Sequence, residues 1–181
     1  VGLARAEELL GGPEAVARER LLILSGDVPL IRGSDLGPLV RGLEQQPECL
    51  LTLLTAEVAE PAGYWRVLRG PGGELRGIRE HRDLAEAERD LREVNAGLYC
   101  VRGGALRGAL SRLTSNNAQG ELYLPDIVAL LLADGQAAAQ PVEAMRGSAD
   151  LLVGVNDLGQ LALAEAALYE RFAAAHRASG V

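Results

Sequence analysis

Several residue types that support common protein functions are scarce or absent in this chain of 181 residues. Lysine is absent, so arginine carries all 18 positive charges, and the net charge is −7. Proteins that bind nucleic acid cluster lysine and arginine, so this acidic balance argues against such a partner. The longest uninterrupted apolar run, residues 127–133, is much shorter than the roughly 20 residues of a spanning helix. We therefore expect no membrane segment, and the first residues do not resemble a signal peptide.

Residues that bind metals or form disulfides are also few. Two cysteines, Cys49 and Cys100, and two histidines, His81 and His176, are too scattered for a zinc site. We expect both cysteines to be buried free thiols of a protein in a reducing compartment. Only six aromatic residues occur, so the core must consist mostly of leucine, valine and alanine. No Ser–His–Asp or Cys–His pattern indicates a nucleophilic enzyme.

Short apolar runs alternate with segments of helical composition. Two segments with partial alternation, 65–69 and 74–80, flank a Gly-Pro-Gly-Gly turn and predict a β-hairpin. No helix follows that glycine cluster, which argues against a phosphate loop. The other predicted strands are 21–24, 50–55 and 97–101, and the predicted helices are 3–10, 35–43, 104–113, 126–133 and 157–178. This order predicts one α/β domain with a mixed, mostly parallel sheet, in which strand 21–24 is buried on both faces.

Asp27 is the first candidate ligand-binding residue. It follows the 21–24 strand and the turn Ser25-Gly26. Ligands of open α/β sheets bind at the carboxyl ends of the strands, and a carboxylate there suits Mg²⁺. The alternative is that Asp27 only forms an Asx-turn before Pro29, and the local sequence does not decide between the two.

Asn156 is the second candidate. Asp157 and Gln160 match a capping box at the start of the last helix, which leaves the Asn156 amide free to face a ligand or metal. The alternative is that Asn156 is itself the helix cap. Glu80, which ends the hairpin, and Asn95, which precedes the 97–101 strand, are polar residues of a kind common at strand edges.

Six sequence islands occur in an order that resembles one family. They are residues 26–31, 63–64, 80–83, 93–97, 116–126 and 154–157. Together they are similar to the uridyltransferase domain of bifunctional bacterial N-acetylglucosamine-1-phosphate uridyltransferase/glucosamine-1-phosphate acetyltransferase. The resemblance covers essentially the whole chain, and its most specific piece is the asparagine-rich stretch Asn116–Asp126.

The resemblance implies a Rossmann-like nucleotide-diphospho-sugar transferase fold and a cytoplasmic enzyme. Its substrates would be UTP and N-acetylglucosamine 1-phosphate, and its products UDP-N-acetylglucosamine and pyrophosphate, for peptidoglycan and lipopolysaccharide synthesis. Because the attacking phosphate is already ionised, catalysis would rest on alignment and on charge neutralisation by Mg²⁺. By position in the motifs, Asp27 and Asn156 would hold the metal, Glu80 and Asn95 the sugar, and Ser25 and Gly26 the nucleotide.

The chain also departs from the family pattern. The first βα unit, with a glycine-rich loop bearing arginine and lysine that cradles the triphosphate, has no counterpart here. Ser25 stands where tyrosine is usual, and Trp65 stands where a glycine lets the backbone approach the sugar. Val1 stands where threonine is usual in the family. Arg82 and Ala96 also differ from the usual residues of their motifs, but these two differences are milder than the others. We therefore expect the chain by itself to be inactive or nearly so.

The last residues, 178–181, resemble the junction that leads into the family's left-handed β-helix acetyltransferase domain. The parent protein would be a homotrimer assembled through that domain. Two alternatives remain open on the sequence. One is a degenerate, non-catalytic module that binds a sugar nucleotide, and the other is a nucleotidyltransferase with a different sugar or base.

Overall fold

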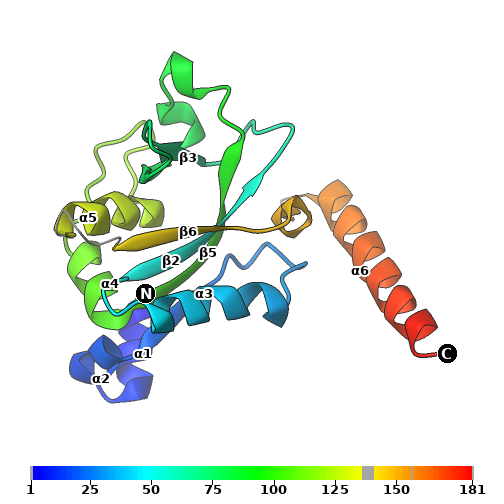
Figure 1. Cartoon of the computed structure of the whole chain (residues 1–181), viewed down its shortest axis with the longest axis horizontal. Coiled ribbons are helices and arrows are strands. Elements are labelled where there is room, and N and C mark those ends of the chain that lie inside the picture. Colours follow the sequence, from blue (N-terminus) through cyan, green and yellow to red (C-terminus); the bar gives the residue numbers. More distant parts are fainter. Residues whose placement is uncertain (1, 136–140, 156, 181) are drawn as a thin grey trace.

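The computed structural model describes residues 2–135, 141–155 and 157–180 and shows a sheet with helices on both faces (Figure 1). The strands are β1 (Arg20–Ile23), β2 (Leu51–Glu57), β3 (Arg66–Arg69), β4 (Leu75–Arg79), β5 (Glu93–Arg102) and β6 (Val142–Arg146). The helices are α1 (Gly2–Leu10), α2 (Pro13–Arg18), α3 (Gly33–Gln45), α4 (Gly103–Leu110), α5 (Ile127–Asp134) and α6 (Leu158–Ala178). Short 3-10 turns are η1 (His81–Asp83), η2 (Glu86–Glu88), η3 (Leu124–Asp126) and η4 (Ala149–Leu152).

The sheet is mixed, as predicted, but most neighbouring strands run antiparallel. The strand order is β4-β3-β5-β2-β6, and β1 also pairs with β5. Strand β5 runs against β1, β2 and β3, and the β3–β4 hairpin adds another antiparallel pair. Among the described strands, only β2 and β6 pair in parallel. The expectation of a mostly parallel sheet is therefore wrong, because β5 lies between strands that share one direction.

Two hydrophobic clusters cover the two faces of the sheet. Leu39 and Leu43 of α3 belong to one cluster, and Leu106 of α4 and Ile127 of α5 belong to the other. Strand β5 contributes residues to both clusters, since successive side chains of a strand point to opposite faces. Its residues Val94, Ala96, Leu98 and Cys100 join the α3 side, while Tyr99 and Val101 join the α4 and α5 side.

Burial on both faces is found in β2 and not in β1. All of β2 except its last residue is buried. In β1, by contrast, Leu22 is 44% exposed, and Leu24 just beyond the strand is 45% exposed. Strand β1 pairs with β5 and with no other described strand, so it is an edge strand. The prediction that segment 21–24 is buried on both faces is therefore wrong.

The prediction that both cysteines are buried free thiols is confirmed. Cys49 and Cys100 are free and buried in the α3-side cluster. Burial raises the pKa of both thiols above the ordinary cysteine value, so they are protonated core residues near neutral pH. Among the described residues, no helix is long and apolar enough to cross a bilayer.

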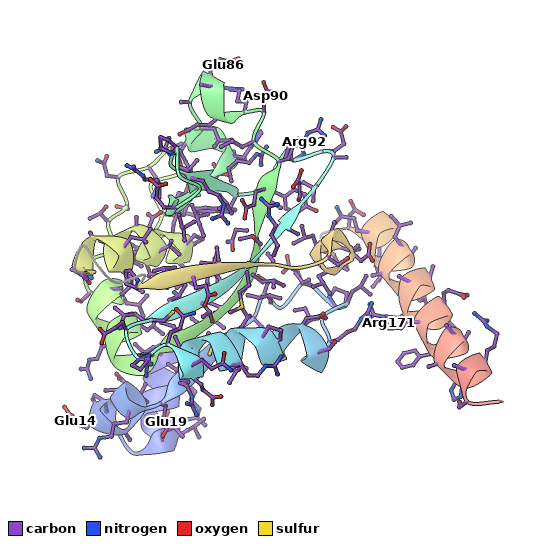
Figure 2. The ribbon with its side chains drawn as sticks, in the orientation of Figure 1. Glu14, Glu19, Glu86, Asp90, Arg92 and Arg171 are labelled. Atoms are coloured by element: carbon purple, nitrogen blue, oxygen red, sulfur yellow. The ribbon has the colours of Figure 1, made fainter. Side chains whose placement is uncertain are left out.

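Helix α6 extends away from the rest of the molecule, with the C-terminus at its far end (Figure 1). Its N-cap is Asp157, whose Oδ1 accepts a hydrogen bond from the backbone N–H of Gln160 at 2.7 Å. The predicted cap and helix are thus confirmed. Figure 2 shows Arg171 directed from α6 toward the body, where its Nη1 donates to the carbonyl of Leu30 at 3.0 Å. Ala164 is the buried residue of this helix.

Candidate functional site

A cavity of about 620 Å³ opens where β1 ends. The segment that follows β1 forms one wall, and the β2–β3 loop forms another. The middle of β5, the η3 turn and the residues around the start of α6 complete it. Four of the predicted site residues line this cavity, namely Ser25, Asp27, Trp65 and Asn95. The fold therefore brings together residues that lie up to 70 positions apart in the sequence.

Asp27 is the one carboxylate among the described residues of the cavity wall. Its side chain is exposed and accepts no hydrogen bond from any residue that the structure describes. The Asx-turn alternative fails on chemistry as well, because Pro29, two residues further on, has no N–H to donate. The backbone carbonyl of Asp27 instead accepts a hydrogen bond from the N–H of Val155 at 2.8 Å. Asp27 thus presents an exposed carboxylate, a hard oxygen donor of the kind that Mg²⁺ prefers, to the cavity.

Asn156, the second predicted metal ligand, lies outside the described residues. Its neighbour Val155 is hydrogen-bonded to Asp27, so the segment before α6 runs beside the turn that carries the carboxylate. The described residues contain no group of three or more His, Cys, Asp or Glu side chains that could hold a metal. A single carboxylate nonetheless suits Mg²⁺, which commonly uses one or two carboxylates and completes its shell with water and substrate phosphates.

Asn95 is held in a defined orientation within β5. Its Nδ2 donates to the hydroxyl of Tyr99 at 2.6 Å, and its Oδ1 accepts from the backbone N–H of Gly97 at 3.2 Å. Burial raises the pKa of Tyr99 to about 12, although the hydrogen bond from Asn95 opposes this shift. The Tyr99 hydroxyl is therefore neutral at physiological pH. The amide of Asn95 thus presents a fixed polar group to the cavity.

Gly97 allows the β1 turn to approach β5 closely. Its φ is +71°, and a Cβ built on it would lie 2.3 Å from Ser25 Oγ. Ser25 Oγ donates a weak hydrogen bond to the carbonyl of Gly97 at 3.4 Å. Ser25 thereby reaches the cavity wall, whereas Gly26 is exposed in the same turn and does not line it.

Trp65 forms part of the wall. Its ring packs edge-on against Tyr123, with centroids 4.7 Å apart and an interplanar angle of 85°. The loop before it is fixed by Tyr64, whose hydroxyl donates to the carbonyl of Leu152 at 3.1 Å. The cavity has a volume of about 620 Å³ with the indole in its wall, so Trp65 does not fill this space.

Glu80 does not line the cavity. It is buried, and its carboxylate caps the η1 turn by accepting a hydrogen bond from the backbone N–H of Arg82. Burial, followed by the charges of Asp83 and Glu80, raises the pKa of Tyr123. Glu80 therefore lies within electrostatic range of Tyr123, and its predicted contact with a sugar stays a prediction.

Sequence reasoning missed several wall residues. Gly97 and Tyr64 belong to the islands that carry the family resemblance, so their motifs held a usable signal. The sequence around Tyr99 held no such signal, because its position in an apolar strand does not predict that its hydroxyl will form a hydrogen bond with Asn95. Gln160 was expected only as a cap partner, yet it also lines the cavity.

No family model matches the chain. Two solved structures share its fold at low sequence identity. A putative glucose-1-phosphate thymidylyltransferase from Bacillus anthracis superimposes with a TM-score of 0.61 and 19% identity, over 85% of this chain and 56% of that one. A CMP:2-keto-3-deoxy-manno-octonic acid synthetase gives 0.60 and 18%, over 94% of this chain and 69% of that one. These likenesses show the fold of nucleotidyltransferases.

Curated relatives named bifunctional protein GlmU are much more similar in sequence. The protein from Sorangium cellulosum is 48% identical over 163 residues, which cover 90% of this chain and 34% of the relative. The protein from Mycobacterium avium is 41% identical and that from Mycolicibacterium gilvum 44% identical, each over 162 residues, 89% of this chain and 32% of the relative. The chain thus spans about a third of the length of the relatives that it matches. Identity at this level over nine tenths of the chain shows that it belongs to the GlmU family and matches the N-terminal uridyltransferase part of those proteins.

Proposed function

We propose that this chain is the sugar-nucleotide-binding part of a Mg²⁺-dependent enzyme that makes UDP-N-acetylglucosamine and pyrophosphate. The substrates would be UTP and N-acetylglucosamine 1-phosphate. The observation that carries the proposal is the cavity at the end of β1, with the exposed carboxylate of Asp27 in its wall. The relationship to the GlmU proteins supports the choice of substrates. A cytoplasmic location and a role in cell-envelope synthesis stay predictions of that relationship.

The residues present fit such a reaction. Asp27, together with Asn156, would hold Mg²⁺, and the ion when bound would neutralise charge on the phosphate oxygens. Asn95, oriented by Tyr99 and Gly97, would donate and accept hydrogen bonds to the sugar. The sugar phosphate is already an anionic nucleophile, so no side chain needs to remove a proton. The contribution of the chain is to align the reactants, which alone can lower a barrier by roughly 7–11 kcal/mol.

Binding can be followed with Trp65, because it is the only tryptophan of the chain and lines the cavity. We expect UDP-N-acetylglucosamine with Mg²⁺ to change its fluorescence in a saturable way. Asp150→Asn is a matched control, since Asp150 is exposed and does not line the cavity. Saturable binding that Asp150→Asn leaves intact supports the proposal. If millimolar ligand leaves both the fluorescence and the heat of mixing unchanged, the proposal fails.

Turnover is a separate question. The sequence holds no glycine-rich loop with arginine and lysine to cradle a triphosphate, and no lysine at all. We therefore expect the 181-residue chain to release no pyrophosphate from UTP and N-acetylglucosamine 1-phosphate above background. Robust release would show that the loop is dispensable.

A further inference from the structure

A second cavity is also lined by residues of the β2–β3 loop. Its volume is about 530 Å³, and its lining shares only Ala62 with that of the first cavity. Its charged and titratable lining residues are Glu60, Arg66, His81, Arg89, Asp90 and Arg92. Figure 2 shows Asp90 and Arg92 together at one end of the molecule, with Glu86 beside them. None of these residues takes part in the site described above.

Arg66 is the unusual member of this set. It begins β3, and the residue is only 1% exposed. Its Nη1 donates to the carbonyl of Tyr64 at 2.5 Å, but its buried Nε has no hydrogen-bond partner among the residues that the structure describes. Among the described residues, no carboxylate forms an ion pair with it, and burial lowers its pKa. A buried guanidinium without a counter-charge is unfavourable, and this one borders a cavity that has room for an anion.

Two neighbours strengthen this observation. The Nδ1 atom of His81 is buried and, within the described part of the chain, has no hydrogen-bond partner. Arg92 is exposed and forms no ion pair with any residue that the structure describes. Arg89 pairs with Glu86 at 3.1 Å, but both side chains are largely exposed, and such pairs are weak.

The charge balance of the cavity favours an anion. Three guanidinium groups face two carboxylates, Glu60 and Asp90, in a chain whose net charge is −7. Guanidinium groups bind phosphate through paired N–H donors, and a site with more than one arginine suits a dianion better than a carboxylate. We propose that this cavity, between the β2–β3 loop and the segment from η1 to Arg92, binds a phosphate group. That group would belong either to inorganic phosphate or to a small phosphomonoester.

The two histidines provide a direct test by NMR. His81 lines the cavity, whereas His176 lies near the end of α6 and serves as an internal reference. The protein is titrated with inorganic phosphate, which replaces chloride at constant pH and ionic strength. Parallel titrations use glycerol 3-phosphate and acetate. We expect the imidazole signals of His81 to shift saturably with phosphate, while those of His176 and the acetate arm show no saturable change. Tighter binding of glycerol 3-phosphate than of phosphate would identify the phosphomonoester as the ligand, and the reverse would identify the free ion.

Two arginine variants make the test specific. Arg92→Gln removes an exposed guanidinium from the lining and should weaken phosphate binding by about tenfold. Arg82→Gln removes an exposed guanidinium next to His81 that is not part of the lining, and should change the affinity less than twofold. An equal loss of phosphate affinity in both variants would show diffuse attraction to the surface and would overturn the proposal. A His81 signal that does not shift with phosphate would also overturn it.

Asp27→Asn separates this proposal from the proposed function. It alters the first cavity, so it should leave the phosphate titration of His81 unchanged. A phosphate affinity at His81 that changes in Asp27→Asn would place the phosphate in the first cavity, where the lost carboxylate alters the charge, and would contradict a second site. Failure to bind UDP-N-acetylglucosamine, by contrast, would leave the His81 result intact.

Discussion

The backbone N–H of Val155 donates a hydrogen bond to the carbonyl of Asp27 at 2.8 Å, although 128 positions separate the two residues. This bond joins the turn after β1 to the segment that leads into α6. Both segments also contribute to the cavity wall. The backbone position of Asp27 is therefore set by two distant parts of the chain, a fixed placement that its proposed role as a metal ligand would need.

The first prediction concerns this carboxylate. Asp27→Asn keeps the size of the side chain but removes the charge that would attract Mg²⁺. We expect the factor by which Mg²⁺ increases the affinity for UDP-N-acetylglucosamine to fall by roughly tenfold or more in this variant. Fluorescence titrations of Trp65 with and without Mg²⁺ measure this, with Asp150→Asn as the control. Unchanged Mg²⁺ dependence in Asp27→Asn would remove Asp27 from the metal site.

The second prediction concerns Asn95 and Tyr99. Asn95→Ala removes the amide that faces the cavity, and we expect it to weaken N-acetylglucosamine 1-phosphate binding by about tenfold. Tyr99→Phe removes only the hydroxyl that orients the amide, so the loss should be smaller, about two- to fivefold. Calorimetric titration of each variant distinguishes the two effects. A larger loss in Tyr99→Phe than in Asn95→Ala would contradict the assigned roles.

The third prediction tests the close approach at Gly97. Alanine there would adopt a φ of +71° and meet Ser25 Oγ at 2.3 Å. We expect Gly97→Ala to lower the free energy of unfolding by about 1–3 kcal/mol, measured by urea denaturation. Adding Ser25→Ala should recover part of the loss, because it removes the oxygen in contact.

Gly108→Ala is the matched control for Gly97→Ala. Gly108 lies inside α4, and a Cβ there would contact nothing within 4 Å. Alanine has the higher helix propensity, so this substitution should raise stability by up to about 1 kcal/mol. Equal destabilisation by both substitutions would argue against a special constraint at Gly97.

The fourth prediction concerns Glu93, which ties together the strands at one end of the sheet. Its carboxylate accepts two hydrogen bonds from Arg69, at 2.6 and 2.7 Å, and one from Thr55 at 2.8 Å. Burial acts to raise the pKa of Glu93, but these hydrogen bonds and the nearby arginines outweigh it, so the pKa is lowered. The ionised carboxylate is therefore favoured by folding.

A lowered pKa in the folded state fixes the sign of the pH effect. Stability from Glu93 is fully present above its unfolded pKa, near 4.5, and is lost as pH falls through the lower folded value. We expect Glu93→Gln to reduce stability at pH 7 by about 1–3 kcal/mol and to flatten the decline below pH 4.5. Glu57→Gln, at an exposed position paired with Arg146, is the control. A parallel acid decline in wild type and Glu93→Gln would exclude this carboxylate as its cause.

The local parts of the fold were predictable from sequence. The hairpin followed from two short alternating segments around Gly70 to Gly73, and the start of α6 from Asp157 and Gln160. The turn after β1 was placed correctly because glycine and aspartate followed an apolar run. The first cavity therefore contains four of the residues that sequence reasoning selected.

The long-range parts were not predictable in the same way. Strand β6 is short and of mixed polarity, and it becomes a strand by pairing with β2, about 90 positions earlier. The insertion of β5 between β1 and β2 made the sheet mostly antiparallel, and no local pattern encodes that order. The exposure of Leu22 has the same origin, since the edge position of β1 depends on strand order.

Paramagnetic NMR with Mn²⁺ in place of Mg²⁺ tests the central claim most directly, namely that Asp27 holds a divalent ion beside the segment before α6. With UDP-N-acetylglucosamine present, we predict that Mn²⁺ broadens the backbone amide signals of Val28 and Val155 first, and that Asp27→Asn abolishes this effect. Broadening that centres elsewhere, or that persists unchanged in Asp27→Asn, would contradict it.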